Sequence, residues 1–323
     1  MRMKALMSWI LACAGLGLCA ATLLGFAGEI WWRFGLLDHF RVQYVGLLLL
    51  IEVAGFLLLW RRWVGLLLIP LIVNLVPIVD LALKPRGGAT LAATQLTVFH
   101  ANIDHTRPRA DEIVALLSAA PADIVFVQEV TPETLVQLQT GLTGYRLVLA
   151  APRRTSHGSA MFVPVTSTLE IQDARIIDLP NGSQRPLLVA DLVFDGAPLR
   201  VMSVHVTLPK TEDTAAAQAR ELVALAEWAN DAMRDGPSVV LVGDFNATPF
   251  SVRFRDMLER GGLLNSQVGW PLQMTWPAGW PMPMQLAIDH LVHSPDLSTL
   301  MRETGPAIGS DHLPLRVTLA RRP

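Results

Sequence analysis

Short apolar runs after about residue 95 repeatedly lead into side chains that can bind a cation or move a proton. The clearest example is Val239–Asn246, in which aliphatic residues are followed by Asp244 and Asn246. The same pattern recurs at Asn102, Glu129, His205, Asp289, Asp311 and His312. Carboxylate and amide oxygens suit hard divalent cations, and histidine transfers protons near neutral pH. These residue types are those of metal-assisted hydrolysis.

The position of these side chains predicts a shared rim. A buried strand that runs directly into an acid or an amide places that group at the edge of its sheet, where strand ends converge. A single aspartate after a strand is more often a turn or capping residue, so each position alone is weak evidence. Their recurrence in one region favours a common site.

The ordered set of these residues resembles the endonuclease/exonuclease/phosphatase superfamily. The residues that carry the resemblance are Asn102, Glu129, His205, Gly243-Asp244-Phe245-Asn246, Ile288-Asp289-His290 and Ser310-Asp311-His312. The resemblance covers Leu96 to Leu319, nearly all of the chain outside its apolar N-terminal region. It implies an α/β fold, a four-layer α/β sandwich of two packed β-sheets flanked by helices, and an enzyme that hydrolyses a phosphoester.

The resemblance also implies a metal cofactor. Glu129 would be the main protein ligand of Mg²⁺ (or Mn²⁺), and Asn102 and Asp311 would assist it directly or through water. Mg²⁺ prefers carboxylate oxygens and water, which agrees with these residue types. The sequence does not choose between Mg²⁺ and Mn²⁺.

The remaining polar residues of the set receive roles from the same resemblance. Asp289 would pair with His312 and fix its tautomer. Asp244 would orient or deprotonate the attacking water, and Asn246 would donate hydrogen bonds to the phosphoryl oxygen as negative charge develops. His205 would contact the phosphate or protonate the leaving group. Members of the superfamily differ over the general base, so the choice between Asp244 and His312 stays open.

Four other residues are weaker candidates. His157 and Arg185 resemble substrate-side positions of the superfamily, although a surface ion pair explains Arg185 equally well. His105 lies in a loop just after the first predicted strand, where it could touch substrate. His100 lies within that strand, and we interpret it as a packing residue or as support for a neighbouring polar group.

Short strands alternate with a few helices from residue 95 onward. The predicted strands are Leu96–Asn102, Asp123–Gln128, Arg146–Leu149, Ala160–Val163, Leu187–Val193, Leu199–His205, Ser238–Val242, Ile288–His293 and Leu315–Leu319. The predicted helices are Arg109–Ala119, Pro132–Gly141 and Thr211–Arg234. Many strands with few helices favour two sheets packed face to face with helices outside.

The N-terminal region has a different composition. Hydrophobic residues make up 51% and charged residues 17% of the chain, and the hydrophobic excess lies before about residue 84. Three apolar runs, about 5–27, 42–60 and 63–83, each approach the ~20 residues that cross a bilayer as a helix. A cleaved signal peptide could explain the first run but not the others. We therefore predict a membrane anchor with three transmembrane helices over residues 1–86, a linker over 87–94 and a catalytic domain over 95–323.

Basic residues predict the orientation of this anchor. Arg2 and Lys4 precede the first predicted helix, and Arg61 and Arg62 lie between the second and the third. Positive residues favour the cytoplasmic side. Three crossings then place the catalytic domain on the extracytoplasmic side of an inner or plasma membrane. Basic residues just after the third run argue weakly against this orientation.

The sequence does not identify the substrate, so three functions stay open. A phosphodiesterase for a lipid head group agrees with the anchor and with the segment Gly269–Met284, which is apolar, stiffened by prolines and suited to interfacial lipid. An extracytoplasmic endonuclease or exonuclease for DNA or RNA needs only local basic residues. The candidates are Arg107, Arg109, Arg153, Arg154 and Lys210. An inactive, membrane-held binding domain is the third, and the near-complete set of motif residues argues against it.

The expected partners are the lipid bilayer and the phosphoester substrate, and no protein partner is predicted. The net charge of -2 provides no global basic field, although proteins that wrap nucleic acid usually show a basic face. The two cysteines, Cys13 and Cys19, both lie in the first apolar run. They therefore cannot build a disulfide framework or a cysteine zinc site in the catalytic domain.

Overall fold

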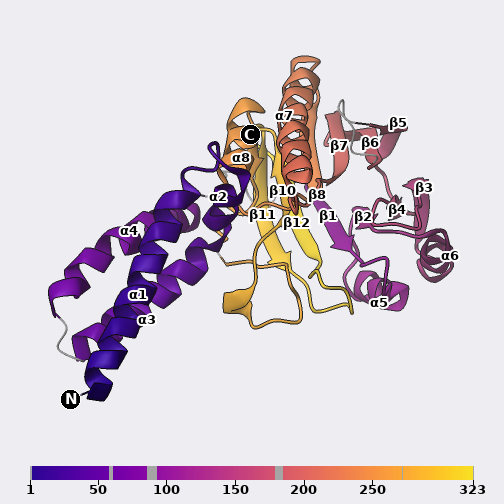
Figure 1. Ribbon diagram of the computed structural model, residues 1–323. Coiled ribbons are helices and arrows are strands. Elements are labelled where there is room, and N and C mark those ends of the chain that lie inside the picture. The colour runs from indigo at the N-terminus through magenta and orange to yellow at the C-terminus, as the bar shows by residue number, and fades with distance from the viewer. Residues whose placement is uncertain (1, 58–60, 86–92, 179–184, 271, 323) are drawn as a thin grey trace. The chain divides into compact units, whose positions relative to one another are not determined.

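The computed structural model describes residues 2–57, 61–85, 93–178, 185–270 and 272–322 (Figure 1). The chain folds as two compact units. One unit is Met1–Lys84 with Pro249–Val252, and the other is Pro85–Thr248 with Arg253–Pro323. Most of the predicted linker 87–94 lies outside the described residues, as do residues 58–60 at the end of the second predicted apolar run.

Long apolar helices dominate the first unit. Its elements are α1 (Arg2–Gly25), α2 (Trp32–Gly35), the 3₁₀ helix η1 (Leu36–Phe40), α3 (Arg41–Leu57) and α4 (Arg61–Leu83). By length and composition, Ala5–Gly25, Trp32–Leu57 and Gly65–Leu83 could each cross a membrane. The second of these begins earlier than the predicted run at residue 42, because α2 and η1 lead directly into α3.

A small polar cluster joins the three long helices. The Asn74 side chain of α4 donates Nδ2–H to Thr22 Oγ1 of α1 at 2.8 Å and to its own helix at the Pro70 carbonyl at 2.8 Å. Arg41 of α3 donates to Asn74 Oδ1 at 3.3 Å. Buried hydrogen bonds of this kind help to hold apolar helices together where the hydrophobic effect between them is weak.

Two six-stranded sheets form the second unit. Their strand orders are β11-β12-β1-β2-β4-β3 and β5-β6-β7-β8-β10-β9. The strand bounds are β1 (Gln95–Asn102), β2 (Ile124–Gln128), β3 (Tyr145–Ala151), β4 (Ser159–Pro164), β5 (Glu170–Ile177), β6 (Leu187–Phe194), β7 (Ala197–His205), β8 (Ser238–Asp244), β9 (Leu264–Asn265), β10 (Asp289–His293), β11 (Leu297–Thr304) and β12 (Leu315–Arg321).

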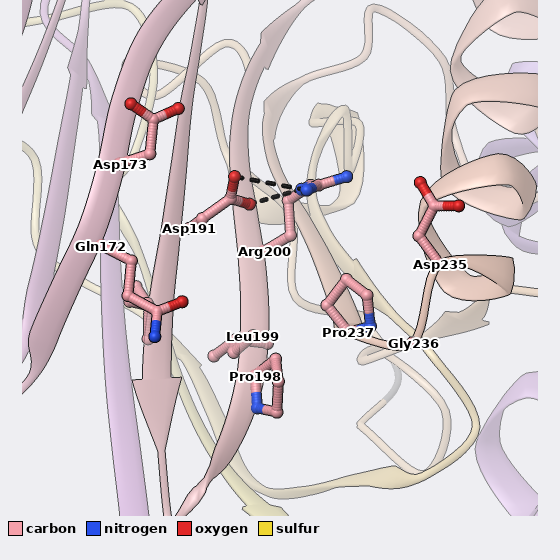
Figure 2. Close-up of a pocket in the computed structure, with 10 residues that line it drawn as sticks. Gln172, Asp173, Asp191, Pro198, Leu199, Arg200, Asp235, Gly236 and Pro237 are labelled. Carbon is pink, nitrogen blue, oxygen red and sulfur yellow. Dashed lines mark hydrogen bonds and ion pairs between the residues drawn. The ribbon is translucent and has the colours of Figure 1, made fainter.

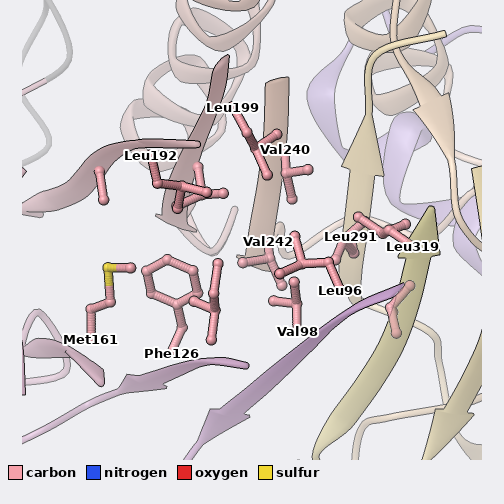
Figure 3. Close-up of a cluster of buried hydrophobic side chains, with 14 of the residues drawn as sticks. Leu96, Val98, Phe126, Met161, Leu192, Leu199, Val240, Val242, Leu291 and Leu319 are labelled. Atoms are coloured by element: carbon pink, nitrogen blue, oxygen red, sulfur yellow. The ribbon is translucent and has the colours of Figure 1, made fainter. Parts of the chain in front are cut away.

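The inner faces of the two sheets share one hydrophobic core. Figure 3 shows Val98 and Phe126 of the first sheet facing Leu199, Val240 and Val242 of the second, and all five are buried. Alternate residues of a strand point to opposite faces. The residues between these core positions therefore point outward, toward the helical layers.

Helices cover both outer faces. The helices α5 (Ala110–Ala119) and α6 (Pro132–Gly141) bury Ile113, Leu117 and Leu138 against the first sheet. The helices α7 (Glu212–Arg234) and α8 (Val252–Arg260) bury side chains such as Leu225 and Phe254 against the second. The order helix, sheet, sheet, helix confirms the predicted four-layer α/β sandwich.

The strands that the sequence did not predict lie at sheet edges. These are β5, β9 and β11, and β5 and β11 each carry polar residues such as Asp173 and Glu303. An edge strand has one unpaired side and often carries charges, so its hydrophobic alternation is weak. The short helix α8 was also missed, because nine residues are too few for a clear helical period.

Two histidines of β10 are buried structural residues. His290 donates Nε2–H to the Ala247 carbonyl at 2.8 Å, and its ring centroid lies 4.5 Å from that of Phe254. His293 donates Nδ1–H to the Ser294 carbonyl at 2.9 Å. Burial lowers the pKa of His290 to about 3 and that of His293 to about 4, so both are neutral in the folded protein at pH 7.

This burial predicts a loss of stability in acid. A histidine of the unfolded chain takes up a proton near pH 6.5, whereas His290 of the folded protein takes one up only at about pH 3. Protonation below pH 6.5 therefore favours the unfolded chain. The stability of the fold is fully present above pH 6.5 and falls as the pH drops below that value. As the pH falls from 6 to 4, the free energy of unfolding should drop more steeply in the wild type than in the variant His290→Phe, by about 1.4 kcal/mol per pH unit. Denaturant unfolding of the detergent-solubilised chain measures this, and parallel pH curves for the two proteins would contradict it.

Candidate active site

Strand register brings the predicted polar residues to one rim. The strands β1 and β2 are parallel and pair Asn102 with Gln128, the residue before Glu129. The strands β7 and β8 are also parallel and pair His205 with Asp244. The strand β10 runs antiparallel to β8 and pairs its first residue, Asp289, with Asp244. Both sheets therefore present their functional side chains at the same end of the sandwich.

The two sheets are tied together at this rim by Gln128. Its Nε2–H donates to the Val204 carbonyl at 2.6 Å, and its Oε1 accepts from the Asp244 backbone N–H at 3.3 Å. Gly243 allows this approach, because a Cβ at that position would lie 2.6 Å from Gln128 Nε2 of the other sheet and 1.8 Å from the Val204 carbonyl oxygen of the neighbouring strand. Its φ of +150° is also one that other residues rarely adopt.

Two functional residues themselves adopt left-handed backbone. Glu129 has φ 64° and Asn246 has φ 48°. Such a conformation costs about 1–3 kcal/mol outside glycine and is concentrated at functional sites. At Glu129, the backbone N–H donates to the Gly158 carbonyl at 2.7 Å and holds the residue in this conformation.

A fully buried carboxylate connects two histidines. Asp289 accepts a hydrogen bond from His312 Nδ1–H at 2.9 Å through one oxygen and from His100 Nε2–H at 3.0 Å through the other. Burial opposes charge on His312, but Asp289 outweighs it and raises the pKa of His312 to about 10. Burial likewise opposes charge on Asp289, but His312 and His100 hold its pKa well below the ordinary value. Asp289 therefore carries the negative charge and His312 the proton.

Asp244 lies beside this pair in a different environment. Its Oδ2 is 3.9 Å from His312 Nε2 and 3.6 Å from His205 Nε2. Burial raises the pKa of Asp244 to about 7, against the opposing effect of His312. Burial also lowers the pKa of His205 well below its ordinary value. Asp244 can therefore exchange a proton near neutral pH, while His205 is uncharged.

Asn246 holds Asp244 in place. Its backbone N–H donates to Asp244 Oδ1 at 2.7 Å. Its side-chain Nδ2 donates to Asp244 Oδ2 at 3.1 Å and to the Val206 carbonyl at 2.9 Å. Both hydrogens of the amide are thus engaged within the protein. This arrangement gives Asn246 a positioning role toward Asp244, which differs from the expected donation to a phosphoryl oxygen.

The expected metal ligands Asn102 and Glu129 are in contact. Asn102 Nδ2–H donates to Glu129 Oε1 at 3.1 Å. Among the described residues, Asp104, His105 and Glu129 each offer one ligand atom, and these atoms all lie within 4.8 Å of one another. Carboxylate, amide and imidazole groups are suitable ligands for a divalent metal ion. The residues at this end of the rim therefore fit such an ion.

Asp311 is not a member of the Asp104–His105–Glu129 group. Its carboxylate is exposed and accepts a hydrogen bond from Trp276 Nε1–H at 3.0 Å. The adjacent Ser310 hydroxyl donates to the Asn102 carbonyl at 2.8 Å and accepts from the His312 backbone N–H at 3.1 Å. This turn anchors His312 to the end of β1 and keeps Asp311 in the neighbourhood of Asn102.

Arg185 is directed toward the acidic groups of the rim. Its Nη1 is buried and has no hydrogen-bond partner among the described residues. Burial lowers the pKa of the guanidinium, and Asp244, Glu221 and Glu129 oppose that change. His157 precedes Gly158, the residue whose carbonyl holds Glu129, and it is half-buried. A buried guanidinium N–H group without a hydrogen-bond partner among the described residues is suited to an anionic substrate.

Two supporting residues, Gln128 and Arg302, had no clear signal in the sequence, whereas His100 was expected to pack or to support a neighbouring polar group, and it donates to Asp289. Gln128 is the last residue of the apolar strand β2. Arg302 belongs to the unpredicted strand β11 and is fully buried, where it donates to Ser266 Oγ at 2.8 Å and to the Asp289 carbonyl at 3.2 Å. Their partners lie far away in the chain, so no local pattern could indicate these contacts.

A cavity of about 420 Å³ lies away from this rim. It surrounds Arg200, near the start of β7, whereas His205 ends that strand (Figure 2). Arg200 donates to both oxygens of Asp191, and Arg175 pairs with the same carboxylate. The two arginines thus engage Asp191, and none of the predicted site residues lines this cavity.

Comparison with known proteins agrees with this geometry. The model of the Endonuclease/Exonuclease/phosphatase family matches residues 99–312. A search of curated protein sequences gave no match. Solved structures with low sequence identity share the fold, which we take as evidence for the fold alone.

Three of these structures illustrate the likeness. A functionally unknown conserved protein from Enterococcus faecalis is 17% identical, with a TM-score of 0.59 over 70% of this chain and 100% of that one. The mannosyl-6-phosphatase of Bacteroides thetaiotaomicron is 17% identical, with a TM-score of 0.57 over 70% and 99%. TDP2 of D. rerio, complexed with a single strand DNA product, is 16% identical, with a TM-score of 0.55 over 70% and 98%.

The close approach at Gly243 gives a test of the rim. In Gly243→Ala, the added Cβ collides with the Val204 carbonyl, and the unfolding free energy should fall by about 3 kcal/mol or more. Gly196→Ala is the matched control. Its φ is +74° with nothing within 4 Å of the added Cβ, so it should lose only about 1–2 kcal/mol. Denaturant unfolding compares the two variants, and equal losses would show that the approach of β7 and β8 is not tight.

Proposed function

The chain belongs to the Endonuclease/Exonuclease/phosphatase family, whose members hydrolyse phosphoesters, and from this premise we propose a membrane-anchored, metal-dependent phosphodiesterase. The observation that carries the proposal is that one rim holds both a candidate metal site and a set of groups that can transfer a proton. The contact between Asn102 and Glu129 suits a divalent ion, and beside it Asp244, Asp289 and His312 are arranged for proton transfer.

Glu129 and Asn102 would hold the metal ion, and Asp311 would assist them directly or through water. Mg²⁺ and Mn²⁺ both suit such ligands. When bound, the ion neutralises charge on the phosphoryl oxygens. Asn102 Oδ1 accepts from the Asp104 backbone N–H at 3.2 Å and keeps a second lone pair. The hydrogen bond from Asn102 to Glu129 orients the carboxylate before the ion arrives.

Asp244 is the general base of the proposed reaction. With its pKa raised to about 7, it is ionised at slightly alkaline pH and basic enough to take a proton from water. His312, with a pKa of about 10, keeps its proton and holds a phosphoryl oxygen through electrostatic attraction. Asp289 and His100 support His312 from behind, and Asn246 orients Asp244.

His205 and Arg185 provide contacts to the phosphate in the proposed reaction. The guanidinium of Arg185 supplies positive charge for phosphoryl oxygens. His205 is neutral and its Nδ1 is buried without a hydrogen-bond partner among the described residues. A neutral imidazole has no acidic proton for the leaving oxygen, so of its two expected roles we retain a hydrogen-bonded contact to the phosphate. His157 is a further substrate contact from the β3–β4 loop.

Of the substrate classes, a lipid agrees best with the segment Gly269–Met284, which precedes Asp289. The base of this segment is tied to the rim, because Trp276 donates to Asp311 and Thr275 Oγ1 accepts from the Asp289 backbone N–H at 3.2 Å. Its tip exposes Trp280 and Met284, each 57% accessible. Exposed tryptophan and methionine side chains can insert among interfacial lipid.

The alternative is an extracytoplasmic nuclease. Two of the basic candidates for binding nucleic acid are paired with acids. Arg109 lies 3.0 Å from Asp111, and Arg154 lies 2.5 Å from Glu133. Ion pairs of this kind reduce the positive field that holds a phosphate backbone. The solved complex of D. rerio TDP2 with a single strand DNA product keeps nucleic acid among the substrates to be tested.

Hydrolysis by the full chain in detergent or vesicles tests the proposal. With Mg²⁺ or Mn²⁺, the wild type should cleave phosphodiester lipids, and Asp244→Ala/His312→Ala should lower kcat/KM by about 1,000-fold or more, because general base and charge stabilisation are both lost. Asp173→Ala, an exposed carboxylate on the edge strand β5, is the control and should keep full activity. Activity that survives the double change would reject the site.

The same assay separates the two substrate classes. Trp280→Ser/Met284→Ser should raise the KM for lipid in vesicles by about tenfold or more, because two apolar contacts are lost, and leave a short soluble diester unaffected. DNA, RNA, sphingomyelin, other phospholipids and phosphoinositides are compared side by side. Cleavage of nucleic acid alone would establish the nuclease.

We further propose that the catalytic unit faces the extracytoplasmic side of an inner or plasma membrane. The three apolar helices and the basic residues around them support this orientation. A phosphatase reporter fused after Pro85 in a bacterial host should be active in the periplasm, and a fusion after Arg62 should be inactive. The reverse pattern would place the catalytic unit in the cytoplasm.

A further inference from the structure

The turn that follows β1 is ordered by its own side chains. Asp104 has φ 52° and donates its backbone N–H to Asn102 Oδ1 at 3.2 Å. Asp104 Oδ1 accepts from the Thr106 backbone N–H at 3.0 Å and from the Thr106 hydroxyl at 2.6 Å. Such Asx-type bonds fix a short turn without regular secondary structure. The position of the next side chain, His105, is thereby restricted.

His105 is directed at the expected metal ligand. Its backbone N–H donates to Glu129 Oε2 at 3.1 Å, and its ring Nδ1 lies 2.6 Å from the same oxygen. The imidazole is 29% exposed and the Glu129 side chain 13%, so both are open to a small ion. The other carboxylate oxygen, Oε1, is held by Asn102.

The distance between Nδ1 and Oε2 has a chemical consequence. When the imidazole carries its single proton on Nε2, both of these atoms present lone pairs, and two acceptors 2.6 Å apart repel each other. A proton or a metal ion between them removes the repulsion. Asp104 offers a third ligand atom within 4.8 Å of both. A cation can therefore replace the proton once the two atoms move apart by a few tenths of an ångström, to about the 3 Å that separates neighbouring ligand atoms of a metal ion.

We propose that His105 Nδ1 is a direct ligand of the metal ion, and that this nitrogen makes the site select Mn²⁺ and later first-row ions over Mg²⁺. The inference rests on the metal-dependent function proposed for this site. Mg²⁺ favours oxygen ligands and keeps its water, whereas imidazole ligands favour first-row transition ions. A nitrogen ligand thus discriminates between two ions that carboxylates bind alike.

The alternative is that His105 only donates its Nδ1–H to Glu129. Hydrogen bonds of this kind commonly orient a ligand without touching the ion. The variant His105→Gln separates the two roles, because its amide can still donate to Glu129 but supplies no imidazole nitrogen. Arg107→Ala is the matched control in the same turn, since Arg107 is exposed and its backbone alone bonds to the turn.

Electron spin echo spectroscopy of Mn²⁺ bound to the full chain in detergent provides the test. The wild type should show ¹⁴N coupling from a directly bound imidazole, and His105→Gln should lose it. Equilibrium titration should show that His105→Gln weakens Mn²⁺ binding by about tenfold or more, whereas Mg²⁺ binding changes by less than about threefold. Arg107→Ala should behave as the wild type.

Each result separates the inference from the proposed function. Absence of ¹⁴N coupling in the wild type, or its survival in His105→Gln, would overturn the role of His105, and the first of these needs no variant to fold. Phosphoester hydrolysis in the same preparation would then leave the proposed function intact. Nitrogen coupling that depends on His105, in a protein that cleaves no phosphoester, would instead reject the function and retain the ligand.

Discussion

The buried carboxylate of Asp289 is the constraint on which the rim depends. An ionised carboxylate without solvent contact is costly unless donors surround it. The carboxylate and its donors come from opposite sheets, because Asp289 opens β10 of the second sheet, whereas His100 lies in β1 and His312 precedes β12 of the first. The compensation exists only where the sheets pack face to face. The four-layer fold is therefore a condition of the site as well as its support.

The same packing separates two carboxylates that neighbour each other in register. Asp289 is flanked by two histidines and has a lowered pKa, whereas burial raises that of Asp244 to about 7. Two acids of one type thus acquire different tasks from their surroundings. In the proposed reaction this difference favours Asp244 over His312 as the general base, a choice that the sequence left open, and Asp289 keeps its expected place as the partner of His312.

The site is divided between the two sheets. Asn102 and Glu129 follow strands of the first sheet, and His205, Asp244 and Asp289 belong to the second. A phosphoester in the proposed reaction would bind across their junction, where Gln128 links the sheets. Small shifts between the sheets would separate the metal ligands from the proton-transfer groups, so tight packing at Gly243 also serves the chemistry.

The amino-acid sequence alone was enough to predict the order of the motifs and the positions of the central strands and of the apolar helices. These features depend on local periodicity and on polar residues directly after apolar runs, such as Asp244 after Val239–Val242. Edge strands were not predicted, because solvent on one side weakens their hydrophobic periodicity. The contacts between Arg302 and Asp289 and between His105 and Glu129 became visible only in the tertiary structure. The same holds for the ion pair between Asp289 and His312. Those contacts join different secondary-structure elements, 13 to 24 residues apart in the chain. Burial and distance, which set the charge of each group, do not exist before these elements pack.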